Sequence, residues 1–180
     1  MKIKIRRAEP GDYKAVQQVH AQPKALRGTL QLPFPSEEMW KKRLEGIGDD
    51  MYALVACVQN ELVAMAGLHL FPKSPRRSHV GYIGMAVHDK WHAKGVGTAL
   101  MKALLDLAEN WLNLSRLELT VFTDNEPALR LYKKLGFVIE GTHEKYAFRD
   151  GGYVDAHTMA RVRSLRPGSV RRRRPGSPGR

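Results

Sequence analysis

The segment that decides the fold is Trp91-His92-Ala93-Lys94-Gly95-Val96-Gly97-Thr98-Ala99-Leu100. It joins an apolar run over residues 82–87, typical of a buried strand, to a run over residues 96–112 with apolar residues at helical spacing. Two glycines at such a junction let the backbone approach a ligand closely, and the free N–H groups of the first helical turn then point at it. The pattern favours a phosphate or pyrophosphate site, with a tight turn alone as the alternative. The apolar positions of the helix are Leu100, Ala103, Leu104, Leu107, Ala108 and Trp111.

The residues after this helix predict a second strand and a short helix. Residues 116–122 alternate polar and apolar side chains, as a half-buried strand does. A strand–helix–strand crossover makes the two strands parallel neighbours. Pro127 suits the first turn of a helix, and Gly136 suits the position after its last turn. Asn125 and Tyr132 are seven residues apart, about two helical turns, so they lie along one side of this helix and its entry loop.

By these two segments the chain resembles the GCN5-related N-acetyltransferases, the GNAT family, which use acetyl-CoA. The cofactor motif of that family, Gln/Arg-x-x-Gly-x-Gly/Ala, is matched by His92, Gly95 and Gly97, with histidine in place of the usual glutamine or arginine. The second motif, Asn-x-x-Ala-x-x-x-Tyr-x-x-x-Gly-Phe, is matched at every position from Asn125 to Phe137. Both motifs occur in the expected order, which supports the assignment.

The resemblance extends over residues 1–163 and implies an α/β fold of the GNAT type. This fold has a mixed, mostly antiparallel central sheet with a parallel, splayed strand pair and helices on both faces. Periodicity and turn residues predict the same order, β-α-α-β-β-β-α-β-α-β-β. In it, Asp12 caps a helix over residues 13–21, a loop runs to Pro35, and Ser36 caps a second helix. Two hairpins are predicted, with strands at residues 51–58, 62–70, 144–148 and 153–163.

The resemblance also implies how acetyl-CoA binds. The pantetheine arm inserts between the splayed strands and pairs with backbone groups of Met85, Ala86 and Val87, one of whose N–H groups stabilises the oxyanion. His92 contributes mostly its backbone. Lys94 adds a positive charge beside the pyrophosphate. The residues expected to hold the pyrophosphate are Gly95, Val96, Gly97 and Thr98.

Tyr132 is the candidate general acid. A phenol with an unperturbed pKa near 10 stays protonated at neutral pH and can give its proton to the departing thiolate. Asn125 is expected to bond the pantetheine arm. The structural alternatives are a core tyrosine on an amphipathic helix and, for Asn125, a helix cap, which does not exclude the first role.

No residue is assigned as the general base. Relatives that use a carboxylate on the strand before the glycine motif carry it at the position of Gly81, which has no side chain. Tyr82, His79, Glu118 and an ordered water remain as candidates. The pKa range of histidine suits the task, but a single histidine at a strand start is more often structural. A water relay from a partly neutral amine is the default expectation.

Four further segments resemble a bacterial subgroup, the L-amino-acid N-acetyltransferases: His20–Pro23, Thr29–Pro33, Pro75–Val80 and Tyr153–Ala156. The acceptor site is therefore expected at the loop of residues 29–35 and the last hairpin. Leu30, Leu32 and Phe34 offer apolar surface for an apolar side chain, and His79 is a further candidate contact. Arg76 or Arg77 would bind a carboxylate, unless both are solvated loop charges.

Composition predicts an ordinary soluble enzyme of one domain. With 180 residues, of which 43% are hydrophobic, the chain can bury a sizeable core. The single Cys57 cannot form an internal disulfide and lies in an apolar run, which favours a reducing cytoplasm and a core role. No segment approaches the length needed to span a bilayer, and the histidines show no metal-ligand spacing, so neither a membrane nor a metal is expected.

The net charge of +12 arises largely at the C-terminal end. Residues 161–180 contain eight arginines and no acid, which leaves +4 for residues 1–160. Residues 164–180, rich in Arg, Pro, Gly and Ser, predict a disordered tail outside a catalytic domain of residues 1–163. Contact of this tail with nucleic acid is the less favoured alternative.

The sequence therefore predicts transfer of an acetyl group from acetyl-CoA to the primary amine of a small molecule, in first place the α-amino group of an L-amino acid. A polyamine, an antibiotic or a protein amine remains as an alternative acceptor, and a polyamine would favour an acidic groove. A non-catalytic CoA-binding protein with a nucleic-acid-binding tail is the alternative from another class, and the intact Tyr132 argues against it. Dimerisation is common in the family, although nothing in the sequence fixes an interface.

Overall fold

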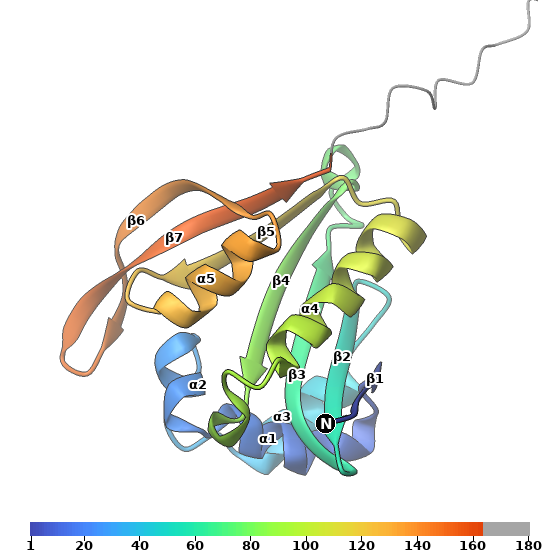
Figure 1. Cartoon of the computed structure of the whole chain (residues 1–180), viewed down its shortest axis with the longest axis vertical. Coiled ribbons are helices and arrows are strands. Elements are labelled where there is room, and N and C mark those ends of the chain that lie inside the picture. Colours follow the sequence, from blue (N-terminus) through green and yellow to red (C-terminus); the bar gives the residue numbers. More distant parts are fainter. Residues whose placement is uncertain (164–180) are drawn as a thin grey trace, which may run out of the picture.

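Seven strands form one sheet in the computed structural model, which describes residues 1–163. Their spatial order is β1-β2-β3-β4-β5-β7-β6, and every neighbouring pair is antiparallel except β4 and β5 (Figure 1). The mixed, mostly antiparallel sheet with one parallel pair is thus confirmed. The tail predicted over residues 164–180 lies outside the described residues. The strands are β1 Ile3–Arg7, β2 Met51–Val58, β3 Glu61–Leu70, β4 Val80–Val87, β5 Arg116–Phe122, β6 Val138–Arg149 and β7 Gly152–Val162.

Helices cover both faces of the sheet (Figure 1). One face packs against α4 and α5, over a core that includes Leu100 and Leu117. The other face packs against α1 and α3, over a second core that includes Val16 and Val55. No helix within residues 1–163 has the length and apolar character needed to cross a membrane. The helices are α1 Tyr13–His20, α2 Pro23–Gly28, α3 Glu37–Glu45, α4 Val96–Asp106 and α5 Glu126–Lys134.

The parallel strands β4 and β5 are joined at one end only. Residues 80–82 of β4 pair with residues 116–118 of β5, a short paired segment here called the joint. Beyond it, among residues 1–163, β4 pairs only with β3 and β5 only with β7. Gly81 lies in the joint. A Cβ at this position would come within 2.7 Å of Leu68 and 2.8 Å of Leu114, so the missing side chain lets the core close there. The strands splay apart beyond it, as expected.

Local sequence signals predicted several turns and caps correctly. Ser36 caps α3, since its Oγ accepts a backbone N–H at 3.0 Å. Gln59 and Asn60 have positive φ angles in the turn between β2 and β3, and Asp150 and Gly151 do so between β6 and β7. Asn, Asp and Gly tolerate the left-handed conformation that such hairpin turns need.

Two predictions near the N-terminus were wrong. Asp12 does not cap α1 with its side chain. Its carboxylate instead forms an ion pair with Arg6 at 2.7 Å and accepts the N–H of Glu9 at 2.8 Å, and a 3-10 turn over residues 10–12 leads into the helix. Part of the predicted loop after α1 forms the short helix α2, with Pro23 in its first turn.

Two further corrections concern the second half of the chain. Trp111 is 77% exposed rather than on the apolar face of the helix, because residues 107–111 form a π-helical turn whose extra residue breaks the apolar register. Strand β6 begins at Val138 rather than at Glu144. As the edge strand its residues are mostly exposed on both faces, so they lack the alternation that reveals a half-buried strand.

Candidate active site

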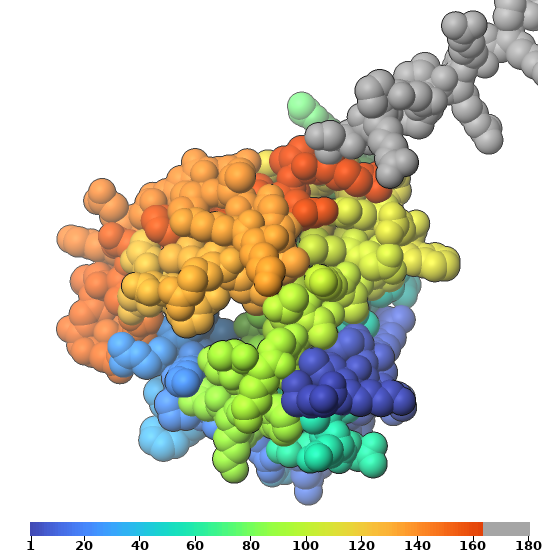
Figure 2. All heavy atoms as spheres, in the orientation of Figure 1, coloured from blue at the N-terminus to red at the C-terminus, as the bar shows by residue number. Residues whose placement is uncertain are grey.

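A cavity of about 860 Å³, here called the cleft, opens where β4 and β5 diverge. The splayed strands form its floor, and α2, α5 and the start of α4 form its sides. Figure 2 shows the opening on the molecular surface, between the orange atoms of α5 and the blue atoms of α2. None of the described residues that line the cleft is acidic. Within residues 1–163, no three His, Cys, Asp or Glu side chains are grouped to hold a metal ion.

The backbone of β4 offers unpaired groups to the cleft. At the joint, the carbonyl of His79 accepts a hydrogen bond from the N–H of Arg116 in β5 at 3.2 Å. At the other end of β4, the N–H of His88 donates to the carbonyl of Val63 in β3 at 2.8 Å. Successive residues of a strand direct their backbone groups to opposite sides. Met85 and Val87 therefore direct theirs toward the cleft, although the carbonyl of Val87 is occupied by the side chain of His92 and only its N–H stays open. Ala86 lies in the cleft wall with its backbone groups toward β3. An extended ligand can pair with this open edge.

Helix α4 begins at the cleft. Gly95 has a φ of +81°, a left-handed conformation that a residue with a Cβ adopts only under strain. A Cβ on Gly97 would lie 3.4 Å from side-chain atoms of both Met85 and Leu131, at the limit of ordinary contact. The first turn holds no acidic residue, and its N–H groups have no partner within the helix. This end of the cleft therefore suits an anion.

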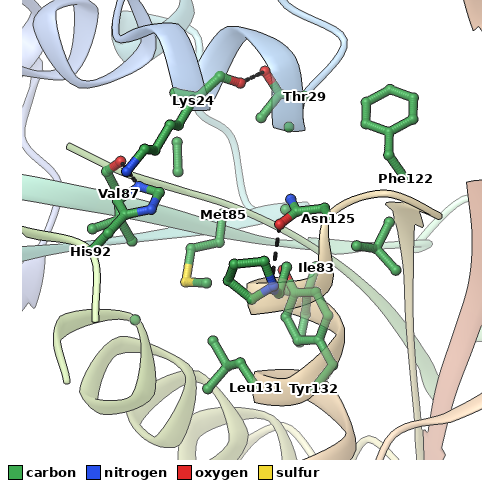
Figure 3. A pocket seen from close by; sticks show the side chains of 18 of the residues that line it. Lys24, Thr29, Ile83, Met85, Val87, His92, Phe122, Asn125, Leu131 and Tyr132 are labelled. Carbon is green, nitrogen blue, oxygen red and sulfur yellow. Dashed lines mark hydrogen bonds between the residues drawn. The ribbon is translucent and has the colours of Figure 1, made fainter. Parts of the chain in front are cut away.

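The side chain of His92 holds the end of β4 (Figure 3). Its Nε2 lies 2.9 Å from the carbonyl oxygen of Val87 and 3.9 Å from Oδ1 of Asp89. Because a carbonyl can only accept, Nε2 carries the proton and donates it to that oxygen. Lys94 is not among the residues that line the cleft. Its Nζ lies 4.9 Å from the ring centre of Trp91, which does line it.

Helix α5 brings two of the predicted side chains to the cleft (Figure 3). Asn125 caps the helix, since its Oδ1 accepts the N–H of Ala128 at 3.3 Å. Tyr132 is 7% exposed and packs against Phe137, with the ring centres 5.9 Å apart. Burial raises the pKa of Tyr132 to about 12, with the neighbouring Tyr82 as a second cause. The phenol is therefore protonated at neutral pH.

Comparison with known proteins identifies the family. Residues 20–137, well over half of the chain, match the model of the acetyltransferase (GNAT) family. The chain belongs to the GNAT family. It is 48% identical over 161 residues to the L-amino acid N-acetyltransferase AaaT of Escherichia coli K12. The aligned region covers 89% of this chain and 98% of that protein. This GNAT protein is an N-acetyltransferase that uses acetyl-CoA.

Solved GNAT structures share the fold. A GNAT acetyltransferase from Streptococcus pneumoniae superposes with a TM-score of 0.76 at 25% identity, over 91% of this chain and all of that one. A phosphinothricin acetyltransferase from Sinorhizobium meliloti, solved with AcCoA, gives a TM-score of 0.79 at 19% identity, over 90% and 89% of the two chains. The α/β GNAT architecture is therefore confirmed.

The GNAT cleft gathers most of the predicted site residues. Those that line it are Met85, Ala86, Val87, His92, Gly95, Gly97, Thr98, Asn125, Tyr132 and, among the acceptor candidates, Leu30. Val96 is fully buried beneath them. Leu32 and Phe34 are 80% and 97% exposed and do not line the cleft. His79 lies at the joined end of β4, away from the splayed part.

Of the side chains considered as a general base, only Tyr82 lines the cleft. Glu118 is engaged elsewhere, because its carboxylate accepts hydrogen bonds from Arg77 and Arg116, each at 2.7 Å. Arg116 also binds Glu140, which lowers the pKa of that carboxyl group. The carboxylate of Glu118 therefore lies between two guanidinium groups.

Sequence reasoning missed the cleft residues that belong to no motif, among them Lys24, Thr120, Phe122 and Tyr146. They come from α2, β5 and β6 and meet only through tertiary packing. Pro23, a residue type favoured in the first turn of a helix, was the one available signal for α2.

Proposed function

We propose that this GNAT enzyme acetylates the α-amino group of an L-amino acid. The observation that carries the proposal is the cleft, where open backbone groups, a helix N-terminus and a buried phenol meet along one cavity. The 48% identity to an L-amino acid N-acetyltransferase supports an amino acid as the acceptor. The lack of acidic side chains along the described walls disfavours a polyamine, whose several positive charges need negative partners.

The residues of the cleft fit acetyl-CoA, which supplies a thioester to the acceptor amine when it is bound. Met85 through its backbone groups and Val87 through its N–H hold the pantetheine arm, as an added strand is held, since the Val87 carbonyl accepts from His92. An N–H of this segment stabilises the oxyanion. The first turn of α4, from Gly95 to Thr98, binds the pyrophosphate. Asn125 directs its amide toward the same arm while it caps α5.

Two proton transfers complete the reaction. Tyr132 gives its proton to the thiolate as the carbon–sulfur bond breaks, because its phenol is protonated and lies in the cleft. The amine enters as the neutral base or loses its proton to water. No carboxylate within residues 1–163 lines the cleft to take that proton. The Nε2 atom of His92 is also engaged, because it donates a hydrogen bond to the carbonyl of Val87.

Thiol release from acetyl-CoA, measured over a panel of L-amino acids, polyamines, aminoglycosides and short peptides, tests this function. We expect turnover with one or a few amino acids and none with polyamines. The control is Gly97→Glu, which places a carboxylate at the pyrophosphate and should abolish acetyl-CoA binding in calorimetry. Turnover with a polyamine or a peptide, and with no amino acid, contradicts the assignment.

We also infer that the enzyme is a homodimer of the cytoplasm. The free and buried thiol of Cys57 supports a reducing compartment. The edge strand β6 supports self-association, because no strand within residues 1–163 pairs with its outer side and it carries exposed apolar side chains such as Phe148.

A further inference from the structure

Arg149, the last residue of β6, is not among the residues that line the cleft, but it contacts three neighbours at the cleft wall. Its side chain is only 14% exposed. Nη1 donates to the carbonyl of Arg27 in α2 at 2.6 Å, and Nη2 forms an ion pair with Asp124, which follows β5. Cζ lies 5.1 Å from the ring centre of Phe122, at the end of β5. The planar, forked guanidinium can serve all three partners at once.

The contacts of Arg149 lie at the open end of the splay between β4 and β5, which helix α2 bridges. The first turn of α2 is held beside the end of β4, because the N–H of Lys24 donates to Oδ2 of Asp89 at 3.3 Å. Its last turn is held beside the end of β5 by Arg149, and Arg27 adds an ion pair with Asp150. Since the described parts of β4 and β5 do not pair at this end, the bridge helps to set their separation.

The contacts of Arg149 converge on Asn125 from two sides. Its partner Asp124 directly precedes Asn125, whose own N–H donates to the carbonyl of Phe122 at 3.0 Å. On the other side, Gly28 follows the α2 carbonyl that Arg149 holds, and a Cβ on Gly28 would lie 3.1 Å from Nδ2 of Asn125. Figure 3 shows Asn125 below this end of the helix. The end of α2 therefore packs against the amide of Asn125.

We propose that Arg149 is a positioning residue for acetyl-CoA. It fixes the side chain of Asn125 through Asp124 and through the end of α2, so that the amide faces the pantetheine arm. A side chain that is fixed before binding loses less conformational entropy on binding, which raises the affinity. This proposal rests on the proposed contact of Asn125 with the arm and does not depend on which amine accepts the acetyl group.

Calorimetry with two ligands tests the positioning role. CoA carries the pantetheine arm, whereas adenosine 3′,5′-bisphosphate is the nucleotide part of CoA without the arm. Arg149→Gln should weaken the binding of CoA by about tenfold and that of the nucleotide by less than about twofold. Arg149→Lys keeps the positive charge beside Asp124 but not the planar fork, so its loss should be intermediate. Equal weakening of both ligands is the result of a general loss of structure and overturns the proposal.

Arg116→Gln is the matched control. Arg116 also joins β5 to β6, through ion pairs with Glu118 and Glu140, and its side chain is 27% exposed. These ion pairs lie at the joint, and their three residues are not among those that line the cleft. Arg116→Gln should therefore leave the affinity for CoA unchanged. The same weakening of CoA in Arg116→Gln as in Arg149→Gln overturns the proposal.

A double-mutant cycle tests whether Arg149 acts through Asn125. Asn125→Ser retains a hydroxyl that can cap α5 and removes the amide. If Arg149 acts through this amide, Arg149→Gln should weaken CoA no further in the Asn125→Ser background than Asn125→Ser does alone. Losses that add in the double variant overturn the proposal, and so does an affinity for CoA that either single variant leaves unchanged.

CoA binding and acetyl transfer together separate this inference from the proposed function. Selective weakening of CoA in Arg149→Gln, with no amino acid acetylated by the wild type, supports the positioning role and overturns the function. Acetylation of amino acids by the wild type, with an affinity for CoA that Arg149→Gln leaves unchanged, supports the function and overturns the positioning role.

Discussion

Tyr132 combines burial with a place in the cleft wall, which is the combination a general acid needs. Tyr132→Phe keeps the ring and removes the proton, so kcat should fall by about 100-fold or more while the acetyl-CoA affinity changes less than about twofold. With its pKa raised to about 12, the phenol stays protonated, and its ionisation should cause no loss of rate between pH 7 and 10. Tyr146→Phe, in the same cleft, is the control, and an unchanged kcat in Tyr132→Phe removes this residue from the mechanism.

At the scale of single residues, the sequence predicted those cleft-lining positions that follow from local spacing. Gly95 and Gly97 flank the start of one helix, and Asn125 and Tyr132 share one side of another. The acceptor contacts were harder to predict, because the exposure of a loop residue such as Phe34 depends on how the loop packs, which no local pattern records.

Helices α1 and α3 meet at a histidine that stays neutral. His20 donates from Nδ1 to the carbonyl of Val16 at 2.9 Å, and its ring lies 4.1 Å from that of Trp40, centre to centre. Burial lowers its pKa to about 4, against an unfolded value near 6.5. Between these values the unfolded chain binds more protons, so stability should fall as the pH decreases through this window, by roughly 2 kcal/mol at pH 5.

Urea unfolding at pH 7.5 and pH 5 measures this loss. His20→Phe keeps an aromatic ring at this position and removes the titrating group, so it should lose less stability than the wild type on acidification. His143→Gln, at an exposed histidine, should behave as the wild type does. The pair of Asp12 with Arg6, which lowers the pKa of Asp12, adds its own loss only at more acidic pH, because the folded pKa lies below the unfolded value of about 3.9. Equal acid sensitivity in all three proteins contradicts the role of His20.

At the scale of elements, prediction succeeded where one face of a segment is buried and failed where it is not. The strand at residues 116–122 and the helix that begins at residue 96 show their buried faces as periodic patterns. The six residues of α2 are too few for a helical pattern to stand out from a loop, and β6 is mostly exposed on both faces. These elements depend on tertiary contacts rather than on local preference.

Across the whole molecule, polar contacts tie α2 to the far half of the sheet. Arg149 of β6 forms an ion pair with Asp124 and donates to the carbonyl of Arg27 at 2.6 Å, and Arg27 forms an ion pair with Asp150. These partners are up to 123 residues apart in sequence. They hold the two sides of the cleft together where β4 and β5 no longer pair. The dimensions of the cleft therefore follow from the complete fold and not from the motifs alone.

The outer edge of β6 gives a prediction for the assembled molecule. Phe148 is 66% exposed and lies against Tyr153, with the ring centres 5.4 Å apart. Its strand has no neighbour on the outer side among the described residues. If this edge forms the proposed homodimer, light scattering should give twice the mass of the chain. Phe148→Lys should raise the dissociation constant of the dimer by at least about tenfold, a loss of roughly 1.4 kcal/mol in the free energy of association, because it buries a charge at the interface.

Phe34→Lys makes the same change at a fully exposed phenylalanine of the loop before α3 and should leave the dimer intact. A monomeric wild type at every concentration, or a dimer lost in Phe34→Lys and kept in Phe148→Lys, contradicts an interface at β6.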